Sequence, residues 1–163
     1  MTDASNRLLI IWHSRTGTSE ALAIAACEGA GGAALLLTAV EVEPEHLLQG
    51  AAFIFVCPEN LASMSGQMKE MFDRCYYPVL GKIEGRSFAT IIAAGSDGEG
   101  AQRQINRIAQ GWRLKRVAEP VIVCTNAQTT KAIMAEKTPE EAALAACRDL
   151  GRGIAEGIAL GIF

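Results

Sequence analysis

Short apolar runs recur along the chain, and none of them alternates apolar with polar residues as a half-exposed strand does. Runs of this kind are typical of parallel strands that helices cover on both faces. Five of them predict strands, at residues 8–13, 34–37, 51–57, 87–94 and 121–124. The pattern therefore favours a parallel sheet in the middle of the molecule.

The segments between the apolar runs show the spacing of α-helices. In residues 63–76 the apolar side chains recur at helical intervals and form one face, which is more typical of a core than of a cofactor site. These side chains are Met64, Met68, Met71, Phe72 and Cys75. Further helices are predicted at residues 19–25, 43–48 and 101–112 and after residue 138.

Glycines, prolines and capping residues set the expected boundaries. The glycine-rich residues 29–32 should end the first helix, Gly50 should end the second helix, and Pro58 should end the third strand. The sequence Thr-Pro-Glu-Glu at 138–141 predicts a capping box at the last helix. The threonine would be the N-cap residue, the proline would take the first helical position, and the second glutamate would take the third.

Five strands that alternate with five helices are typical of the doubly wound α/β class. We expect a single domain over residues 1–163, with a five-stranded parallel sheet and helices on both of its faces. In such sheets, ligands bind at the carboxyl ends of the strands, next to a topological switch point. The segments to inspect are therefore residues 14–18, 58–63 and 95–100, and the segment that follows Cys124.

The composition excludes several classes of protein. Half of the 163 residues are hydrophobic and 20% are charged, as in a globular domain with one substantial core. The net charge of −3 provides no basic surface for nucleic acid. No apolar run approaches the roughly 20 residues of a membrane span, and residues 1–6 do not resemble a signal peptide. The five cysteines form no C-x-x-C pair, so we expect a cytoplasmic protein with neither a disulfide framework nor a zinc site.

The loop after the first strand is rich in hydroxyl groups and precedes a helix. Its residues are Ser14, Arg15, Thr16, Gly17 and Thr18. The first N–H groups of a helix have no intrahelical partner, and the helix dipole adds partial positive charge there. Hydroxyl groups supply further donors, and a glycine lets the backbone approach a ligand closely. We therefore expect this loop to bind phosphate. An ordinary strand-to-helix turn with a capping residue is the alternative.

Two further loops follow strands at the same edge of the expected sheet. The first consists of Pro58, Glu59, Asn60, Leu61, Ala62 and Ser63. In the second, three glycines among six residues allow N–H groups to face a planar or anionic ligand, although a flexible connector has the same composition. The candidate residues of this second loop are Gly95, Ser96, Asp97, Gly98 and Gly100.

These motifs together resemble the flavodoxin-like family. Residues 14–18 are similar to its phosphate loop, T/S-x-T-G-x-T. Pro58, the sequence Ser-Met-Ser-Gly-Gln-Met-Lys at 63–69 and the sequence Phe-Asp-Arg at 72–74 resemble the NAD(P)H-dependent branch, which includes FMN reductases and quinone reductases. With the glycine-rich loop, the motifs cover roughly residues 7–124 in the order and spacing of that family.

This resemblance implies an FMN-binding oxidoreductase in which the flavin performs the redox chemistry. The phosphate would lie on residues 14–18 and the ring between residues 58–63 and 95–100. NAD(P)H would be the reductant, and a small quinone-like or flavin molecule would accept two electrons. The family also suggests a homodimer. An FMN-binding electron carrier and a redox-inactive flavodoxin-like binding module are the alternatives.

Other chemistries at this sheet edge fit the sequence less well. A receiver domain needs an aspartate where this chain has Cys57, and a cysteine phosphatase needs a cysteine in the phosphate loop. That loop also lacks the lysine of a Walker A motif and the glycines of a dinucleotide fingerprint. We interpret Cys57 and Cys124 as small buried residues, and His13 as a structural side chain and not a proton donor or phosphate contact.

Basic residues gather around the fourth predicted helix. Arginine suits bidentate recognition of phosphate, so this cluster is a hypothesis for a site that attracts the 2′-phosphate of NADPH. A solvated helix face is the simpler interpretation. The residues are Arg103, Arg107, Arg113, Lys115 and Arg116.

Overall fold

The computed structural model describes residues 6–163, so residues 1–5, for which we expect no signal peptide, lie outside the described part. The strands are β1 (Arg7–Trp12), β2 (Ala34–Thr38), β3 (Gly50–Asn60), β4 (Ser63–Met64), β5 (Ser87–Ala94), β6 (Lys115–Arg116) and β7 (Val121–Cys124). The helices are α1 (Thr18–Ala30), α2 (Pro44–Gln49), α3 (Gly66–Val79), α4 (Glu99–Gly111), α5 (Thr130–Met134) and α6 (Glu141–Ala159), with a 3₁₀ turn, η2 (Gly31–Ala33), after α1.

The main sheet has the strand order β2-β1-β3-β5, and both β6 and β7 pair with β5. All of these pairings are parallel. From β1 the chain goes first to β2 on one side and then to β3 on the other, which makes β1 the topological switch point. The predicted doubly wound parallel sheet is therefore confirmed. The two-residue strand β6 was not predicted, because it is too short to produce an apolar run.

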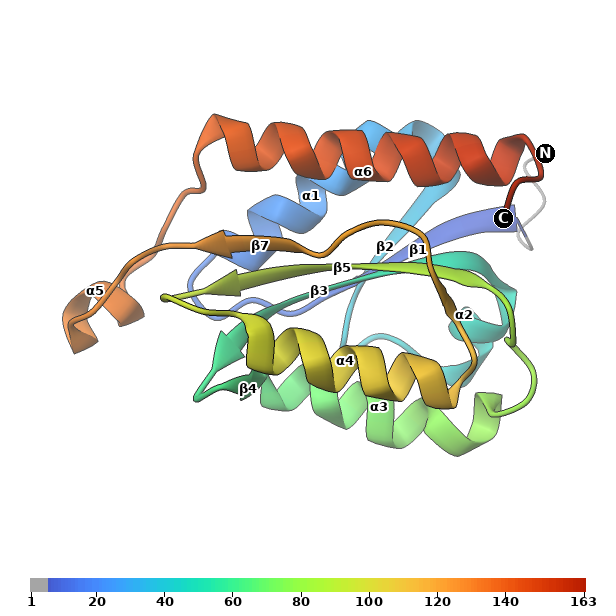
Figure 1. Cartoon of the computed structure of the whole chain (residues 1–163), viewed down its shortest axis with the longest axis horizontal. Coiled ribbons are helices and arrows are strands. Elements are labelled where there is room, and N and C mark those ends of the chain that lie inside the picture. Colours follow the sequence, from blue (N-terminus) through green and yellow to red (C-terminus); the bar gives the residue numbers. More distant parts are fainter. Residues whose placement is uncertain (1–5) are drawn as a thin grey trace.

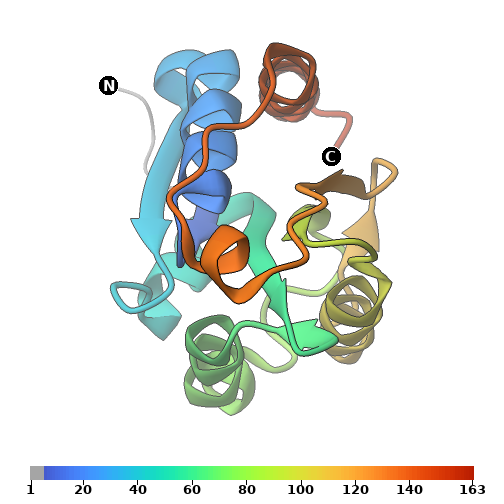
Figure 2. The ribbon, with the colours of Figure 1, turned by 90° about the vertical axis from the view of Figure 1, so that its left-hand side faces the viewer.

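Helices cover both faces of the sheet (Figures 1 and 2): α1 and α6 lie on one face, and α3 and α4 lie on the other. Successive residues of β1 point to opposite faces. Leu8 and Ile10 belong to the core under α1 and α6, whereas Leu9 and Ile11 belong to the core under α3 and α4. Since both faces are buried, the strand needs apolar residues at every position.

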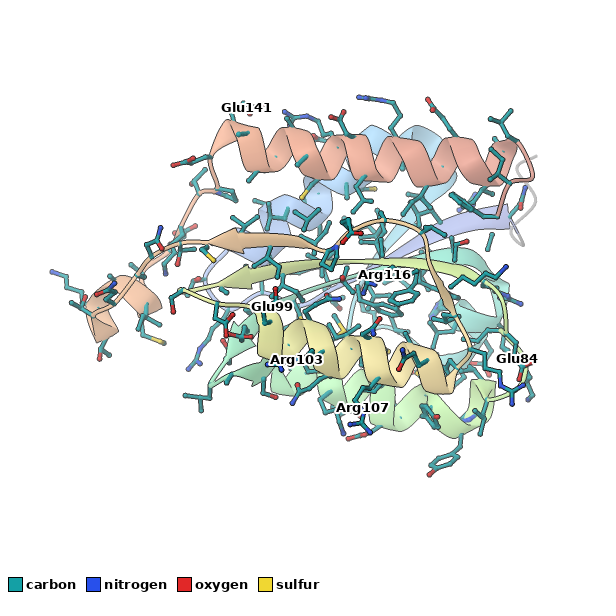
Figure 3. All side chains as sticks on the ribbon, viewed as in Figure 1. Glu84, Glu99, Arg103, Arg107, Arg116 and Glu141 are labelled. Atoms are coloured by element: carbon teal, nitrogen blue, oxygen red, sulfur yellow. The ribbon has the colours of Figure 1, made fainter. Side chains whose placement is uncertain are left out.

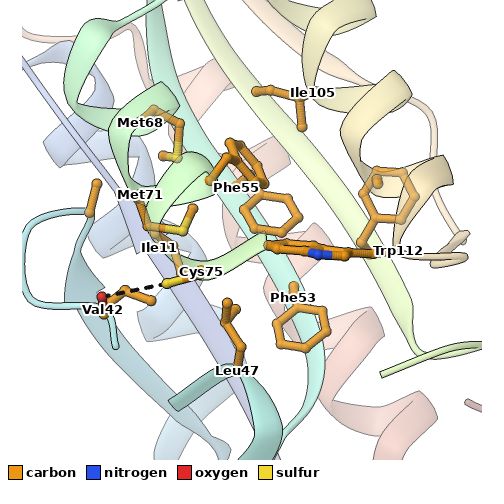
Figure 4. Packing of buried hydrophobic residues seen from close by; sticks show 14 of the residues in the cluster. Ile11, Val42, Leu47, Phe53, Phe55, Met68, Met71, Cys75, Ile105 and Trp112 are labelled. Atoms are coloured by element: carbon orange, nitrogen blue, oxygen red, sulfur yellow. Dashed lines mark hydrogen bonds between the residues drawn. The ribbon is translucent and has the colours of Figure 1, made fainter. Parts of the chain in front are cut away.

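The core under α3 and α4 is rich in aromatic rings (Figure 4). The ring centre of Phe72, from α3, lies 5.0 Å from that of Phe55 and 5.5 Å from that of Trp112. Trp112 is fully buried, and its ring N–H donates to the carbonyl of Tyr76 at 3.0 Å. The three predicted methionines of the helical face are also buried, as a core face requires. These contacts hold α3 and α4 against the sheet and thereby fix the loops that precede them.

The prediction that Pro58 ends the third strand is wrong. Pro58 still pairs with Ala93 of β5, and β3 then leaves the main sheet and continues to Asn60. This extension pairs antiparallel with β4, so residues 58–64 form a hairpin. The predicted helix at 63–76 consequently begins later, at Gly66, because the hairpin uses Ser63 and Met64.

The predicted capping box at residues 138–141 is also wrong. Helix α6 begins at Glu141, and its N-cap residue, Glu140, makes no side-chain capping bond. Just before this segment, the N–H of Lys137 donates to the carbonyl of Thr16 at 2.9 Å, which holds the chain against the first loop and outside the helix. The prediction that Gly50 ends the second helix is confirmed: Gly50 is the C-cap residue of α2, and its extended backbone begins β3.

Candidate functional site

An open pocket of about 510 Å³ lies at the carboxyl ends of β1, β3, β5 and β7, at the sheet edge that faces the viewer in Figure 2. Four segments contribute its walls: the loop after β1 with the start of α1, the hairpin, the end of β5, and the segment after β7. The lining residues are Ser14, Arg15, Thr16, Thr18, Ser19, Pro58, Glu59, Asn60, Ala93, Ala94, Gly95, Thr125, Ala127, Ile133 and Lys137.

The first wall is built around Gly17. Its φ of +99° lies in the left-handed region, which a glycine adopts without strain. Its N–H donates to the hydroxyl of Ser14 at 3.0 Å, and its carbonyl accepts the N–H of Ala21 at 3.0 Å. Among the described residues no side chain caps the start of α1. The first turn of the helix therefore keeps N–H groups for a ligand, as an anion site requires.

Two buried hydroxyl groups in this wall have no partner. Thr18 is 4% exposed and Ser19 is 1% exposed, and both residues line the pocket. Within residues 6–163, neither Thr18 Oγ1 nor Ser19 Oγ has a hydrogen-bond acceptor or donor. A buried hydroxyl without a partner costs about 1–3 kcal/mol. A phosphate at the N-terminus of α1 would satisfy both hydroxyls, so this wall fits the phosphate end of FMN.

The hairpin wall is fixed to α4 by Glu59. One carboxylate oxygen accepts the N–H of Gly98 at 2.9 Å, and the other accepts the N–H of Ala101 at 3.0 Å. A carboxylate is stabilised at a helix N-terminus by these donors and by the helix dipole. Leu61 and Ala62, at the tip, have positive φ values of 53° and 61°, as in the tight turn of a two-residue hairpin. Glu59 is therefore bound to backbone N–H groups and sets the position of the hairpin.

Of the candidate residues in the glycine-rich loop, only Gly95 lines the pocket. Gly98 is the N-cap residue of α4 with a φ of +90°, and a Cβ there would lie 2.6 Å from a methyl group of Ile122. A Cβ at Gly100 would lie 2.1 Å from the carbonyl oxygen of Ala62. These two glycines permit close packing between β7, α4 and the hairpin, and neither residue is part of the pocket lining.

The fourth wall comes from the segment that connects β7 to α6. The N–H groups of Thr125 and Asn126 donate to the carbonyls of Ala94 and Gly95, both at 2.8 Å. Its other end is tied to Thr16 by the bond from Lys137 that was described above. The segment thus spans the pocket from the third wall to the first, and α5 lies at the centre of Figure 2. The side chain of Ile133, from α5, lines the pocket and is 48% exposed.

The structure brings half of the sixteen predicted binding residues to the pocket: Ser14, Arg15, Thr16, Thr18, Pro58, Glu59, Asn60 and Gly95. The other half lie outside its lining: Gly17, Leu61, Ala62, Ser63, Ser96, Asp97, Gly98 and Gly100. The prediction missed these lining residues: Ser19, Ala93, Ala94, Thr125, Ala127, Ile133 and Lys137. For the last four, the only signal was that a strand ends at Cys124.

Half-buried His13 lies with buried Cys57 and Ser65 in a polar cluster outside the pocket lining. His13 Nδ1 lies 2.8 Å from Ser65 Oγ, which fits the structural interpretation of this histidine. Burial and, secondly, the charge of Arg15 lower the pKa of His13 below its usual value. Burial also raises the pKa of the Cys57 thiol to about 12, although hydrogen bonds with Ser65 partly oppose this. Cys57 is therefore the small buried residue that we predicted.

Cys124 is exposed, so the prediction of a buried residue is wrong there. It is the last residue of β7, which pairs only with β5 among the described strands, so no strand covers its other side. Its Sγ lies 3.9 Å from the carbonyl oxygen of Asp97.

The basic residues around α4 do not form one surface (Figure 3). Arg116 lies between α4 and the sheet, where it donates to Thr90 Oγ1 at 3.1 Å and lies 4.6 Å from the ring centre of Phe88. Arg103 and Arg107 are exposed on α4, and Arg113 forms an exposed ion pair with Glu84 at 3.6 Å. None of these residues lines the described pocket. The arrangement favours the solvated helix face over a site for the 2′-phosphate of NADPH.

Within residues 6–163, no helix has the length and apolar character to cross a membrane. No group of three His, Cys, Asp or Glu side chains is arranged there to hold a metal ion.

Comparison with known proteins agrees with the fold. The family described as NADPH-dependent FMN reductase matches residues 45–129, more than half of the chain. A flavodoxin from Aquifex aeolicus (strain VF5) is 27% identical over 164 residues, with 94% of this chain and 88% of that protein covered. The fold is similar to that of a flavodoxin from the domain Archaea, with a TM-score of 0.78, 17% identity, and coverage of 94% of this chain and 99% of that one. It is also similar to an NADPH-quinone reductase from P. pentosaceus, with a TM-score of 0.65, 16% identity, and coverage of 89% and 97%.

The family match extends from α2 through the hairpin, α3 and α4 to the beginning of the fourth wall. The match thus includes the hairpin and the end of β5, which form the second and third walls of the pocket. The first wall lies outside the match but contains the hydroxyl groups that suit a phosphate. The chain belongs to the NADPH-dependent FMN reductase family, an FMN-binding family with the flavodoxin-like fold.

Proposed function

We propose that this protein is an FMN-dependent oxidoreductase that takes two electrons from NADH or NADPH and passes them to a small quinone-like or flavin acceptor. The observation that carries this proposal is the pair of unpartnered hydroxyls of Thr18 and Ser19, buried in the pocket wall at the start of α1. Membership of the FMN reductase family supports the choice of ligand and of reductant.

Different walls of the pocket would contact different parts of FMN. Ser14, Thr16, Thr18 and Ser19 would donate to the phosphate from the first wall, with the positive charge of Arg15 beside them. The hairpin and the end of β5 would border the ring, because they form the opposite part of the lining. When bound, FMN supplies the redox chemistry, since its ring accepts a hydride and later releases two electrons.

The protein contributes binding and orientation more than acid–base chemistry. Among the described lining residues, the titratable side chains are Arg15, Glu59 and Lys137. Both carboxylate oxygens of Glu59 accept backbone N–H groups, so this side chain orients the hairpin. Hydride transfer from a nicotinamide needs no general base, which agrees with a lining of hydroxyls, backbone and apolar groups.

The binding part of the proposal is tested by titrating FMN into the wild type and into a Ser14→Ala/Thr16→Ala double variant. Loss of two hydrogen bonds to a charged group should weaken FMN binding by at least 10-fold. Equal affinities in the two proteins would contradict the proposed phosphate site. Arg107→Gln, an exposed change away from the lining, is the matched control and should bind FMN as the wild type does.

An FMN-binding electron carrier is the second candidate, because the chain is 27% identical to a protein named flavodoxin over 94% of its length. A carrier needs a surface for its partners, and Leu61 at the hairpin tip is a fully exposed apolar side chain. The net charge of −3 favours the reductase, since long-range steering to a basic partner increases with charge. A carrier would resist reduction by nicotinamides, whereas a redox-inactive binding module would also fail to mediate any electron transfer.

The proposal also includes a homodimer, which the family resemblance implies, and a cytoplasmic location, which the pattern of cysteines favours. The state of assembly is measured by sedimentation of the FMN-loaded protein. A monomer across the micromolar range would contradict the dimer without affecting the proposed chemistry.

A further inference from the structure

Lys137 lies next to the first wall, although the two are about 120 residues apart in the sequence. Its N–H donates to the carbonyl of Thr16 at 2.9 Å, and a Cβ at Gly17 would lie 3.4 Å from its carbonyl oxygen. Its half-buried side chain is part of the pocket lining. A lysine is thus positioned beside the loop and the helix N-terminus that are suited to a phosphate.

The ammonium group of Lys137 is held in a defined place. It donates to the carbonyls of Ile133 and Ala135, both at 2.7 Å. A lysine ammonium has three donors, so these two bonds leave one for a ligand. Because the two carbonyls fix the side chain, a contact with the ligand would cost less conformational entropy than one from a freely rotating lysine.

The charges around this group favour an anion. Arg15 and Lys137 are the two cationic residues of the described lining, and Glu59 is its one carboxylate. The oxygens of Glu59 are engaged by Gly98 and Ala101. Glu20 and Glu136 are exposed neighbours of the first wall. The lining thus has one more positive than negative charge, while the whole chain has a net charge of −3.

We propose that Lys137 is a phosphate-recognising residue of this pocket, supplied by the segment after β7 and not by the phosphate loop. Lysine binds phosphate as a point charge and needs no planar geometry. With this residue the pocket would select a phosphorylated flavin over the same flavin without phosphate. The inference rests on the proposed function, because it concerns the ligand of the same pocket.

The test separates a phosphate contact from a purely structural role in α5. Affinities for FMN and for riboflavin are measured by calorimetry in the wild type, in Lys137→Met and in Lys137→Arg. Loss of a contact with the phosphate should weaken FMN binding by about 10-fold and change riboflavin binding by less than about twofold. Lys137→Arg should restore most of the FMN affinity. Lys131→Met removes an exposed lysine of α5, in the same segment after β7 but outside the lining, and should change neither affinity.

The salt dependence gives a second readout. The preference of the wild type for FMN over riboflavin should fall as ionic strength rises, and it should fall less steeply in Lys137→Met, because salt screens charge–charge attraction. Lys137→Gln provides the same comparison if Lys137→Met does not fold, since an amide can still donate to the carbonyls of α5.

The possible outcomes distinguish the inference about Lys137 from the proposed function. Equal weakening of FMN and riboflavin binding in the Lys137 variants would show a structural role and overturn the inference, while the proposed function would stand. Unchanged FMN affinity in these variants would also overturn it. If the wild type binds neither FMN nor riboflavin, both the inference and the proposed function are wrong.

Discussion

Thr18 and Ser19 place two hydroxyl groups where the protein without ligand gains nothing from them. Both groups are buried and lack a partner within residues 6–163. Alanine and valine are alternatives without a polar group, so stability alone does not explain these two residues. Their polar atoms become useful when an anion lies at the start of α1, and for this reason we propose that the phosphate of the ligand lies there.

Thr18→Val therefore should affect binding and stability in opposite directions. Removal of the unpartnered hydroxyl should leave the free energy of unfolding of the ligand-free protein unchanged or raise it, by up to about 1–3 kcal/mol. FMN affinity should fall by roughly 10- to 100-fold. Urea denaturation and FMN titration measure the two effects.

Thr90→Val is the control for this pair of measurements. Thr90 is also fully buried, but its hydroxyl contacts Gln102 at 2.6 Å and Arg116 at 3.1 Å, and it lies outside the pocket lining. This variant should lose stability and keep its FMN affinity. A loss of stability in Thr18→Val like that of Thr90→Val would mean that the Thr18 hydroxyl has a partner within the protein.

His13 makes the stability depend on pH. Burial and the charge of Arg15 lower its pKa in the folded protein below the usual 6.5, so the unfolded chain takes up a proton first as the pH falls. The contribution of His13 is therefore complete above about pH 6.5 and is lost as the pH falls below that value. Urea midpoints between pH 7.5 and 5.5 should fall more steeply in the wild type than in His13→Gln. Parallel curves would contradict the lowered pKa.

At the scale of elements, the accuracy of the sequence prediction follows burial. The predicted strand 87–94 coincides with β5, in which every residue is buried, because strands with helices on both faces appear as uninterrupted apolar runs. The strand 121–124 coincides with β7, which is only half-buried but has the same apolar pattern. The hairpin was missed, because its turn uses Leu61 and Ala62 in the left-handed region, where Asn-Gly is the usual signal. The short α5 has no apolar period, and its position depends on bonds to Ala94, Gly95 and Thr16, far away in the sequence.

The sequence around Gly98 suggests a contact with the ligand, but the glycine is needed for packing between β7 and α4. A glycine in a loop at the sheet edge suggested close approach to the flavin, but its missing side chain makes room for Ile122. Gly98→Ala should lower the free energy of unfolding by about 1–3 kcal/mol, because the new Cβ requires a strained φ of +90° and meets a methyl group at 2.6 Å. The intrinsic FMN affinity of the fraction that remains folded should change little.

Thermal denaturation and FMN titration of Gly98→Ala measure these two quantities. Gly32→Ala is the control, since a Cβ there would meet no atom within 4 Å and its φ is not in the left-handed region. If Gly98→Ala keeps wild-type stability but binds FMN much more weakly, Gly98 contacts the ligand and its packing role is wrong.

At the scale of the whole molecule, the pocket is a product of topology. The strand order brings the ends of β1, β3, β5 and β7 to one edge, so four distant segments meet there. The apolar runs predicted this edge and the segments that form its four walls, but no binding residue was named in the segment after Cys124. Which side chains of each wall face the ligand depends on tertiary bonds, such as those of Glu59 with α4, and these have no local signal in the sequence.

The central claim is that this chain binds FMN in the pocket and transfers electrons to it from a nicotinamide. The most direct measurement is an anaerobic titration of the FMN-loaded protein with NADH and with NADPH, followed by the visible absorbance of the flavin. We expect FMN to bind and its absorbance to bleach with at least one of the two nicotinamides, with one equivalent reducing one flavin. A protein that binds no FMN, or one whose bound FMN resists both nicotinamides for many minutes and yet is reduced by dithionite, would contradict the account.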